Sequence, residues 1–300
     1  MPVWSNALGS LQYHLLTATS ALETAGVEDA RLTAEVLLGK AIDRSRAAVL
    51  ARLEEPLAAD QAAQFQEWVA RAADHEPLAY LVGEREFFGL PLRVTPDVLV
   101  PRPETELLVE RGLVWLREIG SSSHLAQPNQ PRRVIDVGTG SGAIVIALAL
   151  RWPEASYTAV DVSADALAVA QANARRHGVD GRITFRQHDL LPVGEFDLIC
   201  ANLPYIPTRT LNTLPVARHE PRLALDGGDD GLALIRRLLQ QAPAQATLLL
   251  EIQSDQAARV CALTSGRACT VHRDLGGLDR VVELSGQRTN NVTHPQTLHQ

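Results

Sequence analysis

The chain has 300 residues, 46% of them apolar, which is enough for one large domain with its own core and a smaller one beside it. A formal net charge of −7 disfavours extended contacts with phosphates, because duplex binding usually rests on a basic face, so we expect no stable nucleic-acid partner. No basic stretch followed by an apolar one begins the chain, and no run approaches the ~18 apolar residues of a membrane span; we expect a cytoplasmic monomer with no membrane segment.

The first 75 residues show apolar side chains at helical spacing and no strand pattern. Leu8, Leu11, Leu15 and Leu22 form one such series, and a second follows between residues 32 and 42. Rows of this kind are typical of the inward face of a helical bundle. We therefore predict a small helical domain over residues 1–75.

Residues 76–102 change to short alternating runs with turn residues between them. The runs are Leu78–Gly83 and Glu86–Val94, and Gly89 and Pro91 interrupt the second. Alternation bounded by Gly and Pro is typical of short strands joined by turns. The pattern predicts a β-hairpin connector.

The segment Pro101-Arg102-Pro103 begins an amphipathic helix that we expect to run from about Glu104 to Ile119. Glu104 and Glu106 stand in its first turn, where the helix dipole favours acidic side chains. Arg102 either contacts a substrate or clamps the connector onto the following domain. Residues 121–130, rich in Ser, Pro, Asn and Gln, are predicted to form a loop.

Strand and helix patterns then alternate regularly, which predicts one α/β domain over residues 103–287, followed by a disordered polar tail at 288–300. Such alternation specifies a mostly parallel sheet covered by helices on both faces, with ligands at the carboxyl ends of its strands. The predicted strands are Val134–Val137, Tyr157–Val162, Ile183–Gln187, Phe196–Ala201, Thr247–Ile252, Thr270–His272 and Arg280–Leu284; the predicted helices are Ala143–Arg151, Ala164–His177, Asp230–Gln241 and Gln256–Leu263.

The three cysteines, Cys200, Cys261 and Cys269, form no CxxC pair and are odd in number. Neither a disulfide framework nor a zinc site is indicated by this spacing. We expect buried or half-buried thiols and no metal site.

A glycine-rich turn, Gly138-Thr139-Gly140-Ser141-Gly142, follows the first predicted strand of the sheet and precedes a helix. Residues without a bulky Cβ at this place let a ligand approach the backbone closely. The spacing also fits the relaxed form of a dinucleotide fingerprint. Glycine alone does not distinguish NAD from S-adenosylmethionine.

Three residues at the ends of the next two strands are candidates for the same ligand. Asp161 ends the second strand, where its carboxylate can accept both hydroxyls of a ribose; the alternative is a cap on the following helix. Asp189, after the third strand, can meet an adenine amine, with Leu190 as an apolar wall; the alternative is an ordinary turn residue.

The fourth strand ends in Asn202-Leu203-Pro204-Tyr205, which favours methyl transfer to a planar nitrogen. The lone pair of such a nitrogen is tied up in resonance, so it needs acceptors for its N–H groups and a face to stack on. Asn, a Pro carbonyl and Tyr supply both, whereas an oxidoreductase should show a Tyr with a nearby Lys, or a His as proton donor. The alternative is a Pro turn with a buried Tyr.

Taken together, these residues resemble the class I S-adenosylmethionine-dependent methyltransferases, and within them the protein-(glutamine-N(5)) methyltransferases that modify peptide-chain release factors. The block Pro101–Glu106 is the most specific part, because it looks like a signature of that family alone. The resemblance covers most of the chain and is carried by Pro77–Gly89, Val98–Glu106, Asp136–Gly142 and Glu220–Gly228.

The resemblance implies a Rossmann-like seven-stranded sheet, a helical domain that helps to hold the substrate, and S-adenosylmethionine as cofactor. The expected substrate is the glutamine of a Gly-Gly-Gln motif in class-1 release factors. The Asn202 side-chain carbonyl and the Pro204 backbone carbonyl would accept the two amide N–H bonds, while Tyr205 packs against the amide plane. We expect the cofactor to contact Gly138–Gly142, Asp161, Asp189, Leu190 and Asn202, and the substrate to contact residues 202–205.

One position departs from the family pattern, since Leu203 stands where a proline is usual. Asn-Leu-Pro-Tyr also resembles adenine dimethyltransferases that act on ribosomal RNA, so an adenine amine in RNA or DNA is a second possible target. A module that binds S-adenosylmethionine without catalysis is a third possibility. Leu203 would contribute only its backbone and an apolar wall.

Overall fold

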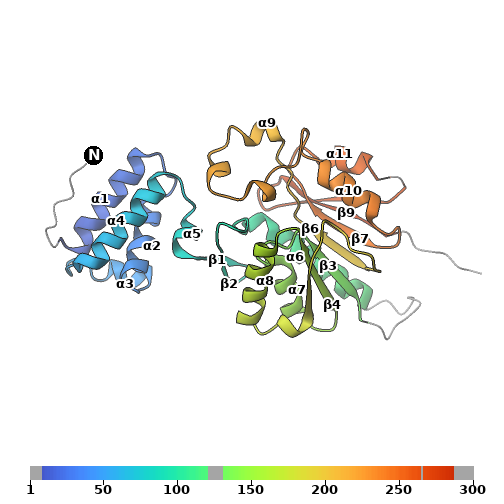
Figure 1. Ribbon diagram of the computed structural model, residues 1–300, viewed down its shortest axis with the longest axis horizontal. Coiled ribbons are helices and arrows are strands. Elements are labelled where there is room, and N and C mark those ends of the chain that lie inside the picture. Colours follow the sequence, from blue (N-terminus) through green and yellow to red (C-terminus); the bar gives the residue numbers. More distant parts are fainter. Residues whose placement is uncertain (1–8, 121–130, 265, 287–300) are drawn as a thin grey trace, which may run out of the picture.

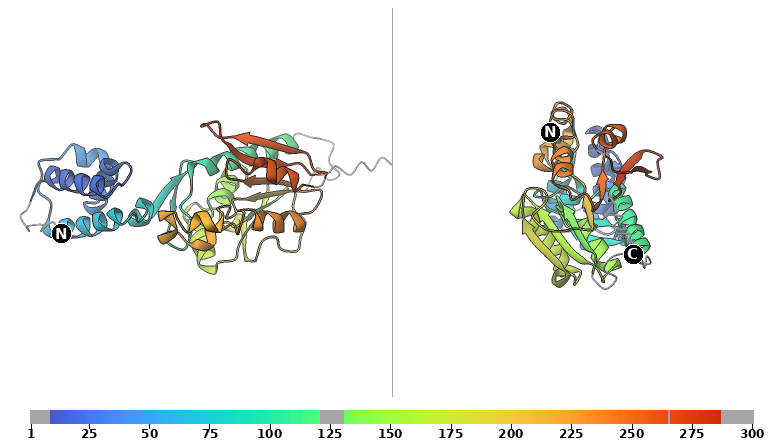
Figure 2. Two further views of the ribbon diagram at one scale, coloured as in Figure 1. Left: turned by 90° about the horizontal axis from the view of Figure 1, so that it is seen from above. Right: turned by 90° about the vertical axis from the view of Figure 1, so that its right-hand side faces the viewer.

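The computed structural model describes residues 9–120, 131–264 and 266–286. It has a helical lobe, formed by the first part of the chain, and a larger α/β lobe, joined by one short segment (Figures 1 and 2). The predicted loop at 121–130 and the predicted tail at 288–300 lie outside the described residues. Among the described residues, no helix is long and apolar enough to cross a membrane.

The helical lobe contains α1 (Leu11–Thr24), α2 (Ala30–Ala41), α3 (Arg46–Leu50) and α4 (Ala59–Ala73). Two of these helices begin at a serine whose side chain accepts a backbone N–H: Ser10 bonds to Tyr13 and Ser45 to Ala48, as is usual for helix caps. Most of the predicted apolar rows pack together in its core, which includes Leu11, Leu15, Leu22, Leu37, Leu38, Val49, Phe65 and Val69. Leu32 is exposed instead, and Leu8 lies outside the described residues.

The connector differs from the prediction in its first half. Residues Leu78–Val82 form a short helix, α5, and only β1 (Glu84–Phe87) and β2 (Leu90–Arg93) make the hairpin. The expected strand at 78–83 is therefore wrong. Tyr80 is buried and donates to the Val98 carbonyl at 2.6 Å, so tertiary packing decided the conformation of an apolar run too short for its periodicity to specify one.

Within the described residues the α/β lobe is built on a seven-stranded sheet of order β5-β4-β3-β6-β7-β9-β8. Its first five strands in that order are parallel, and β9 and β8 are antiparallel additions at one edge. The predicted α/β class is confirmed. The strands are β3 (Arg133–Val137), β4 (Ser156–Asp161), β5 (Ile183–Gln187), β6 (Leu198–Ala201), β7 (Thr247–Glu251), β8 (Cys269–Arg273) and β9 (Asp279–Leu284).

Helices cover both faces of this sheet, because alternate residues of its central strands point in opposite directions. On β3, Val134 belongs to one core with α6 and α7, while Ile135 belongs to a second core with α10 and α11. The helices are α6 (Glu106–Gly120), α7 (Ala143–Arg151), α8 (Ala164–Arg176), α9 (Thr208–Leu211), α10 (Ala233–Gln241) and α11 (Ala257–Ala262), with short 3₁₀ turns at Pro103–Thr105, Asp180–Arg182, Pro215–Arg218 and Arg222–Ala224.

The cysteines also differ from the expectation. Cys261, in α11, and Cys269, at the start of β8, form a disulfide with their Cα atoms 5.8 Å apart. The fold brings the end of a helix and the start of the next strand together, which their spacing in the sequence does not reveal. Cys200 is a buried thiol as expected, and burial raises its pKa.

Candidate active site

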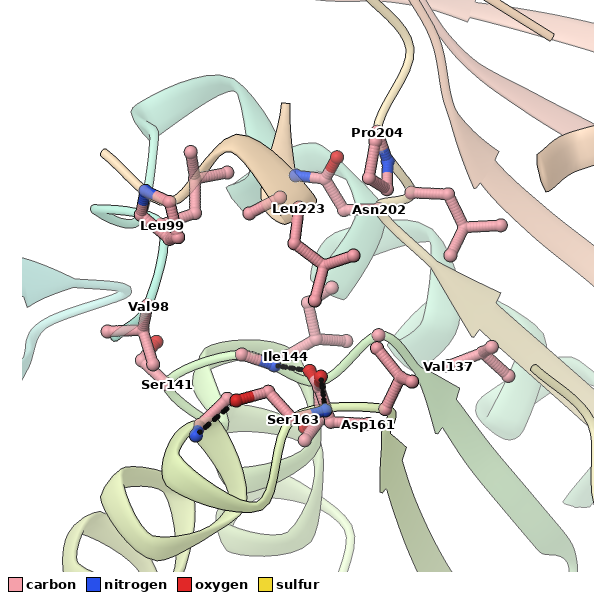
Figure 3. Close-up of a pocket in the computed structure, with 18 of the residues that line it drawn as sticks. Val98, Leu99, Val137, Ser141, Ile144, Asp161, Ser163, Asn202, Pro204 and Leu223 are labelled. Atoms are coloured by element: carbon pink, nitrogen blue, oxygen red, sulfur yellow. Dashed lines mark hydrogen bonds between the residues drawn. The ribbon is translucent and has the colours of Figure 1, made fainter. Parts of the chain in front are cut away.

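A cavity of about 350 Å³ lies at the carboxyl ends of β3, β4 and β6, where a parallel sheet is expected to bind ligands. Figure 3 shows Asp161 and Ser163 on one side of it, Val98 and Leu99 on another, and Asn202 and Pro204 across from Asp161. The predicted site residues that line it are Gly138, Thr139, Gly140, Ser141, Asp161, Asp189, Leu190, Asn202, Leu203 and Pro204. Gly142 and Tyr205 are not among its lining residues.

The glycine-rich turn places its backbone at the edge of the cavity. Gly140 has φ +53, and a Cβ added there would meet no heavy atom within 4 Å, so the turn is open on this side. Gly142 has φ +82, and a Cβ there would lie 2.8 Å from Ile146 and 3.2 Å from Ala170. Gly142 thus serves close packing between the turn and the helices behind it.

Asp136 supports the turn from inside the protein. It is fully buried, and its Oδ2 accepts hydrogen bonds from the Thr139 hydroxyl at 2.7 Å and the Val145 amide at 3.3 Å. Burial raises the pKa of Asp136 to about 7, against the opposing effect of these two bonds. The carboxyl group therefore fixes the backbone that lines the cavity.

Asp161 is held by backbone amides on both oxygens. Oδ2 accepts from Gly140 at 2.9 Å and Oδ1 accepts from Ser163 at 2.9 Å (Figure 3). Because each carboxylate oxygen has two acceptor sites, both can take a further hydroxyl group. The cap of α8 is Ser163, whose hydroxyl accepts from Ala166 at 3.1 Å, so Asp161 is not the helix cap.

Asp189 and Leu190 lie beside α10. Arg237 of that helix lines the cavity and donates to Asp189 Oδ2 at 2.7 Å, which leaves Oδ1 for another donor. Leu190 is buried and contributes an apolar wall. The sequence reasoning missed Arg237, because a helix period alone does not show which face meets a strand end.

The Asn202 side chain has a defined orientation. Its Nδ2 donates to the hydroxyl of Thr105 at 3.1 Å, so its Oδ1 is the atom left to accept. Thr105 is buried and belongs to the specific block Pro101–Glu106. We did not predict this contact, because Thr105 and Asn202 are far apart in the sequence.

Leu203 and Pro204 complete this wall. Leu203 is buried, and its Cδ2 would lie 3.2 Å from a Cβ added to Gly138, so it packs directly under the glycine-rich turn. The Pro204 carbonyl accepts no hydrogen bond from the described part of the chain. It is packed so closely that a Cβ on Gly227 would lie 2.8 Å from its oxygen.

Tyr205 is directed toward β7. Its hydroxyl bonds to Oε1 of Glu251 at 3.3 Å, and its backbone carbonyl accepts from Gln256 at 2.9 Å. Burial raises the pKa of the phenol, and the Glu251 charge raises it further. The expected stacking of this ring on a substrate amide has no counterpart in the cavity lining and stays a prediction.

The rest of the block Pro101–Glu106 fastens neighbouring segments around the cavity. Arg102 forms an ion pair with Glu220, whose other oxygen accepts from the Val100 amide at 3.2 Å. Glu106 accepts from the Phe88 amide of the hairpin at 2.7 Å. Of the two roles considered for Arg102, the clamp is the one that these contacts support.

Similarity to known proteins covers both lobes. A family profile described as PrmC N-terminal domain matches residues 15–83, and one described as Methyltransferase domain matches residues 129–257. A protein of Moorella thermoacetica named release factor glutamine methyltransferase is 44% identical over 90% of this chain and 96% of its own length. A protein of the same name from Geobacter sulfurreducens is 40% identical over 86% and 90%.

A solved structure shares the fold. The crystal structure of the hMettl16 catalytic domain in complex with the MAT2A 3′UTR hairpin 6 has a TM-score of 0.52 and 14% identity, over 76% of this chain and 82% of that one. At this identity the similarity concerns architecture alone. The Rossmann-like sheet predicted from the sequence is thereby confirmed.

Proposed function

Because this chain belongs to the family of release factor glutamine methyltransferases, we propose that it methylates the side-chain amide nitrogen of glutamine in the Gly-Gly-Gln motif of class-1 peptide-chain release factors. S-adenosylmethionine is the methyl donor, as for class I methyltransferase domains. The observation that carries the proposal is the orientation of Asn202, whose amide group is bonded to Thr105 through Nδ2 and leaves Oδ1 to accept.

The residues around the cavity fit a nucleoside cofactor. The open side of Gly140 admits a ligand against the backbone, Asp161 offers two further acceptor sites for ribose hydroxyls, and Asp189 Oδ1 offers one for an amine. Leu190 and Val137 supply apolar walls. When bound, the cofactor supplies an electrophilic methyl group.

The protein's part in the reaction is positioning. A glutamine amide nitrogen is a poor nucleophile, since its lone pair is delocalised into the carbonyl. Asn202 Oδ1 and the Pro204 carbonyl accept its two N–H bonds and hold the nitrogen in one direction. Positioning of this kind can account for about 7–11 kcal/mol of the barrier, and no general base is required because the proton becomes acidic as the new bond forms.

Tyr205 is assigned to the support of the motif. Its hydroxyl is engaged by Glu251 and its carbonyl by Gln256, which fixes the residue that follows Pro204. Stacking on the substrate amide would require the ring to turn toward the cavity when the substrate enters.

Transfer to an adenine amine is the less favoured alternative. A flipped base is usually held between aromatic rings, and the residues that line this cavity include no Phe, Tyr or Trp. Its lining includes aliphatic side chains such as Leu99 and Leu223, which fit a slender glutamine side chain between glycines. A non-catalytic binding module would not need the oriented Asn202 amide.

We also propose that the chain acts as a cytoplasmic monomer that meets its substrate transiently and holds no stable nucleic acid. The acidic net charge of −7 supports the last point. The helical lobe is proposed to contact the release factor, because His219, two residues before Pro221 of the cavity lining, bonds to the Asp74 carbonyl at 2.7 Å, just after α4. A substrate at the cavity would therefore lie near both lobes.

The test is incubation with labelled S-adenosylmethionine and a bacterial class-1 release factor. We expect label on the intact factor and none on a version in which alanine replaces the Gly-Gly-Gln glutamine. Pools of rRNA and DNA run in parallel. Label on nucleic acid instead, or retention of label by the alanine version, would refute the proposal.

A further inference from the structure

Glu251, the last residue of β7, is a buried carboxyl group that no step of the proposed reaction uses. Glu251 is 1% exposed and does not line the cavity. Oε1 receives the Tyr205 hydroxyl at 3.3 Å, whereas Oε2 has no hydrogen-bond partner among the described residues. Burying a hydrogen-bond acceptor without a donor costs free energy, which indicates that the Glu251 carboxyl group has a function in this site.

Thr105 supplies what Glu251 lacks. The Thr105 hydroxyl accepts from Asn202 Nδ2 at 3.1 Å, and its own hydrogen has no acceptor among the hydrogen bonds of the described residues. The Thr105 hydroxyl also lowers the pKa of Glu251, which favours the charged form of that carboxyl group. A hydroxyl that donates to Glu251 must present its oxygen lone pair to Asn202.

A hydrogen bond between Thr105 and Glu251 belongs to the inference, and its direction would decide which end of the Asn202 amide meets the substrate. If Thr105 donates to an ionised Glu251, Asn202 must donate to Thr105, and its Oδ1 is left for the substrate N–H. If Glu251 is protonated and donates to Thr105, the Thr105 hydrogen is free to point at Asn202. The Asn202 amide group is then more stable in the reversed orientation, in which Oδ1 accepts from Thr105. Its NH₂ group, which cannot accept a substrate N–H, then faces the cavity.

We propose that Glu251 is a positioning residue for methyl transfer, whose ionised form holds Thr105, and through it Asn202, in the orientation that binds the substrate amide. The inference rests on the role of Asn202 in the proposed function. Glu251 and its partners thereby connect three segments that are far apart in the sequence: the end of β7, the block Pro101–Glu106 and the Asn202–Tyr205 motif.

The charges around Glu251 set the pH at which this orientation is lost. Burial is the main cause that raises its pKa and Glu104 adds to it, while Thr105, Arg280 and Tyr205 lower it; together they bring the pKa of Glu251 to about 7. Arg280 is itself paired with Asp274 at 3.0 Å, so it only partly offsets the burial. Turnover should therefore rise with pH through neutrality, in step with ionisation of the carboxyl group.

The experiment compares variants by the pH dependence of kcat on a release factor, from about pH 6 to about pH 9, together with S-adenosylmethionine affinity. E251Q should lose the step in kcat near neutral pH and turn over about 100-fold more slowly, with cofactor affinity little changed. E283Q is the matched control, because Glu283 is a half-buried carboxylate on the neighbouring strand β9, and it should keep the step.

The pair T105V and T105S provides a second line of evidence that does not depend on how E251Q folds. T105V keeps the shape but removes the hydroxyl and should be about as slow as E251Q, whereas T105S should recover at least about tenfold of the lost turnover. The double variant T105V/E251Q should be no slower than T105V, since coupled positions are not additive.

Three results would overturn the inference: a wild-type profile flat near neutral pH, a step that survives in E251Q, or a T105S variant as slow as T105V. The outcome for N202A separates this inference from the proposed function. If N202A is inactive while E251Q and T105V behave like the wild type, only the role of Glu251 fails. If N202A is fully active, the proposed role of Asn202 in holding the substrate amide is itself refuted.

Discussion

Gly227 tests how finely the Pro204 carbonyl is placed. This glycine is buried, and a Cβ added to it would lie 2.8 Å from the Pro204 oxygen, the Tyr205 Cα and the Gly231 Cα. All three neighbours are backbone atoms. To reach ordinary contact at 3.4 Å, the motif must retreat by about 0.6 Å, the difference from 2.8 Å.

We therefore predict that Gly227→Ala lowers kcat on the release factor by roughly 100-fold, because a displacement approaching 1 Å has an effect of that order. This corresponds to about 2.7 kcal/mol of transition-state stabilisation. The affinity for S-adenosylmethionine should change little, since Gly227 does not line the cavity. Overpacking should also lower the free energy of unfolding by about 1–3 kcal/mol.

The assay is single-turnover methylation with labelled cofactor, combined with calorimetric titration of the cofactor. Gly181→Ala is the matched control, because Gly181 is exposed and an added Cβ there meets nothing within 4 Å; its turnover should equal that of the wild type. A folded Gly227→Ala protein that keeps kcat within about threefold of wild type would refute the idea that carbonyl placement limits the reaction.

Three further predictions concern stability and cofactor binding. His14 is buried with no hydrogen-bond partner on either ring nitrogen among the described residues, and burial lowers its pKa. Its contribution to the free energy of unfolding should thus be complete above the ordinary imidazole pKa of about 6.5 and should fall as the pH drops below that value. Thermal melts should show this loss in the wild type and not in His14→Phe. Arg102→Leu leaves the Glu220 carboxylate, whose side chain is 1% exposed, without its cation, so urea unfolding should show a loss of about 3 kcal/mol, most of which Glu220→Gln should restore in the double variant; additive losses would argue against a charge effect. Asp161→Asn should weaken S-adenosylmethionine binding about tenfold, or about 1.4 kcal/mol, without changing KM for the release factor, and an unchanged cofactor affinity would remove Asp161 from the ribose site.

Much of the α/β lobe could be predicted because its signals are local. The apolar run of β3 and the Ala143–Arg151 helix are specified by periodicity within a few residues, and the observed bounds agree with the prediction for that helix. The glycine-rich turn is likewise local, since positive φ values at Gly138 and Gly140 favour glycine. Alternation of such units then fixes a parallel sheet.

What the sequence could not reveal depends on contacts between distant residues. Residues 78–82 are too few to show a hydrophobic period, and the burial of Tyr80 favoured a helical conformation there. The Cys261–Cys269 disulfide depends on how α11 meets β8. In the site, the partners of Asn202 and Tyr205 are Thr105 and Glu251, which belong to other segments, and no spacing rule joins them.

Leu203, the departure from the family pattern, has a structural explanation. Its side chain is buried against Gly138, where it fills the space under the glycine-rich turn. The groups proposed to bind the substrate amide are instead Asn202 Oδ1 and the Pro204 carbonyl, neither of which belongs to residue 203. An apolar side chain of similar volume at this position therefore keeps the cofactor turn and the substrate motif in contact, and it alters no proposed hydrogen bond. The departure consequently gives no support to a nucleic-acid target, which would need aromatic rings at a cavity whose lining has no Phe, Tyr or Trp.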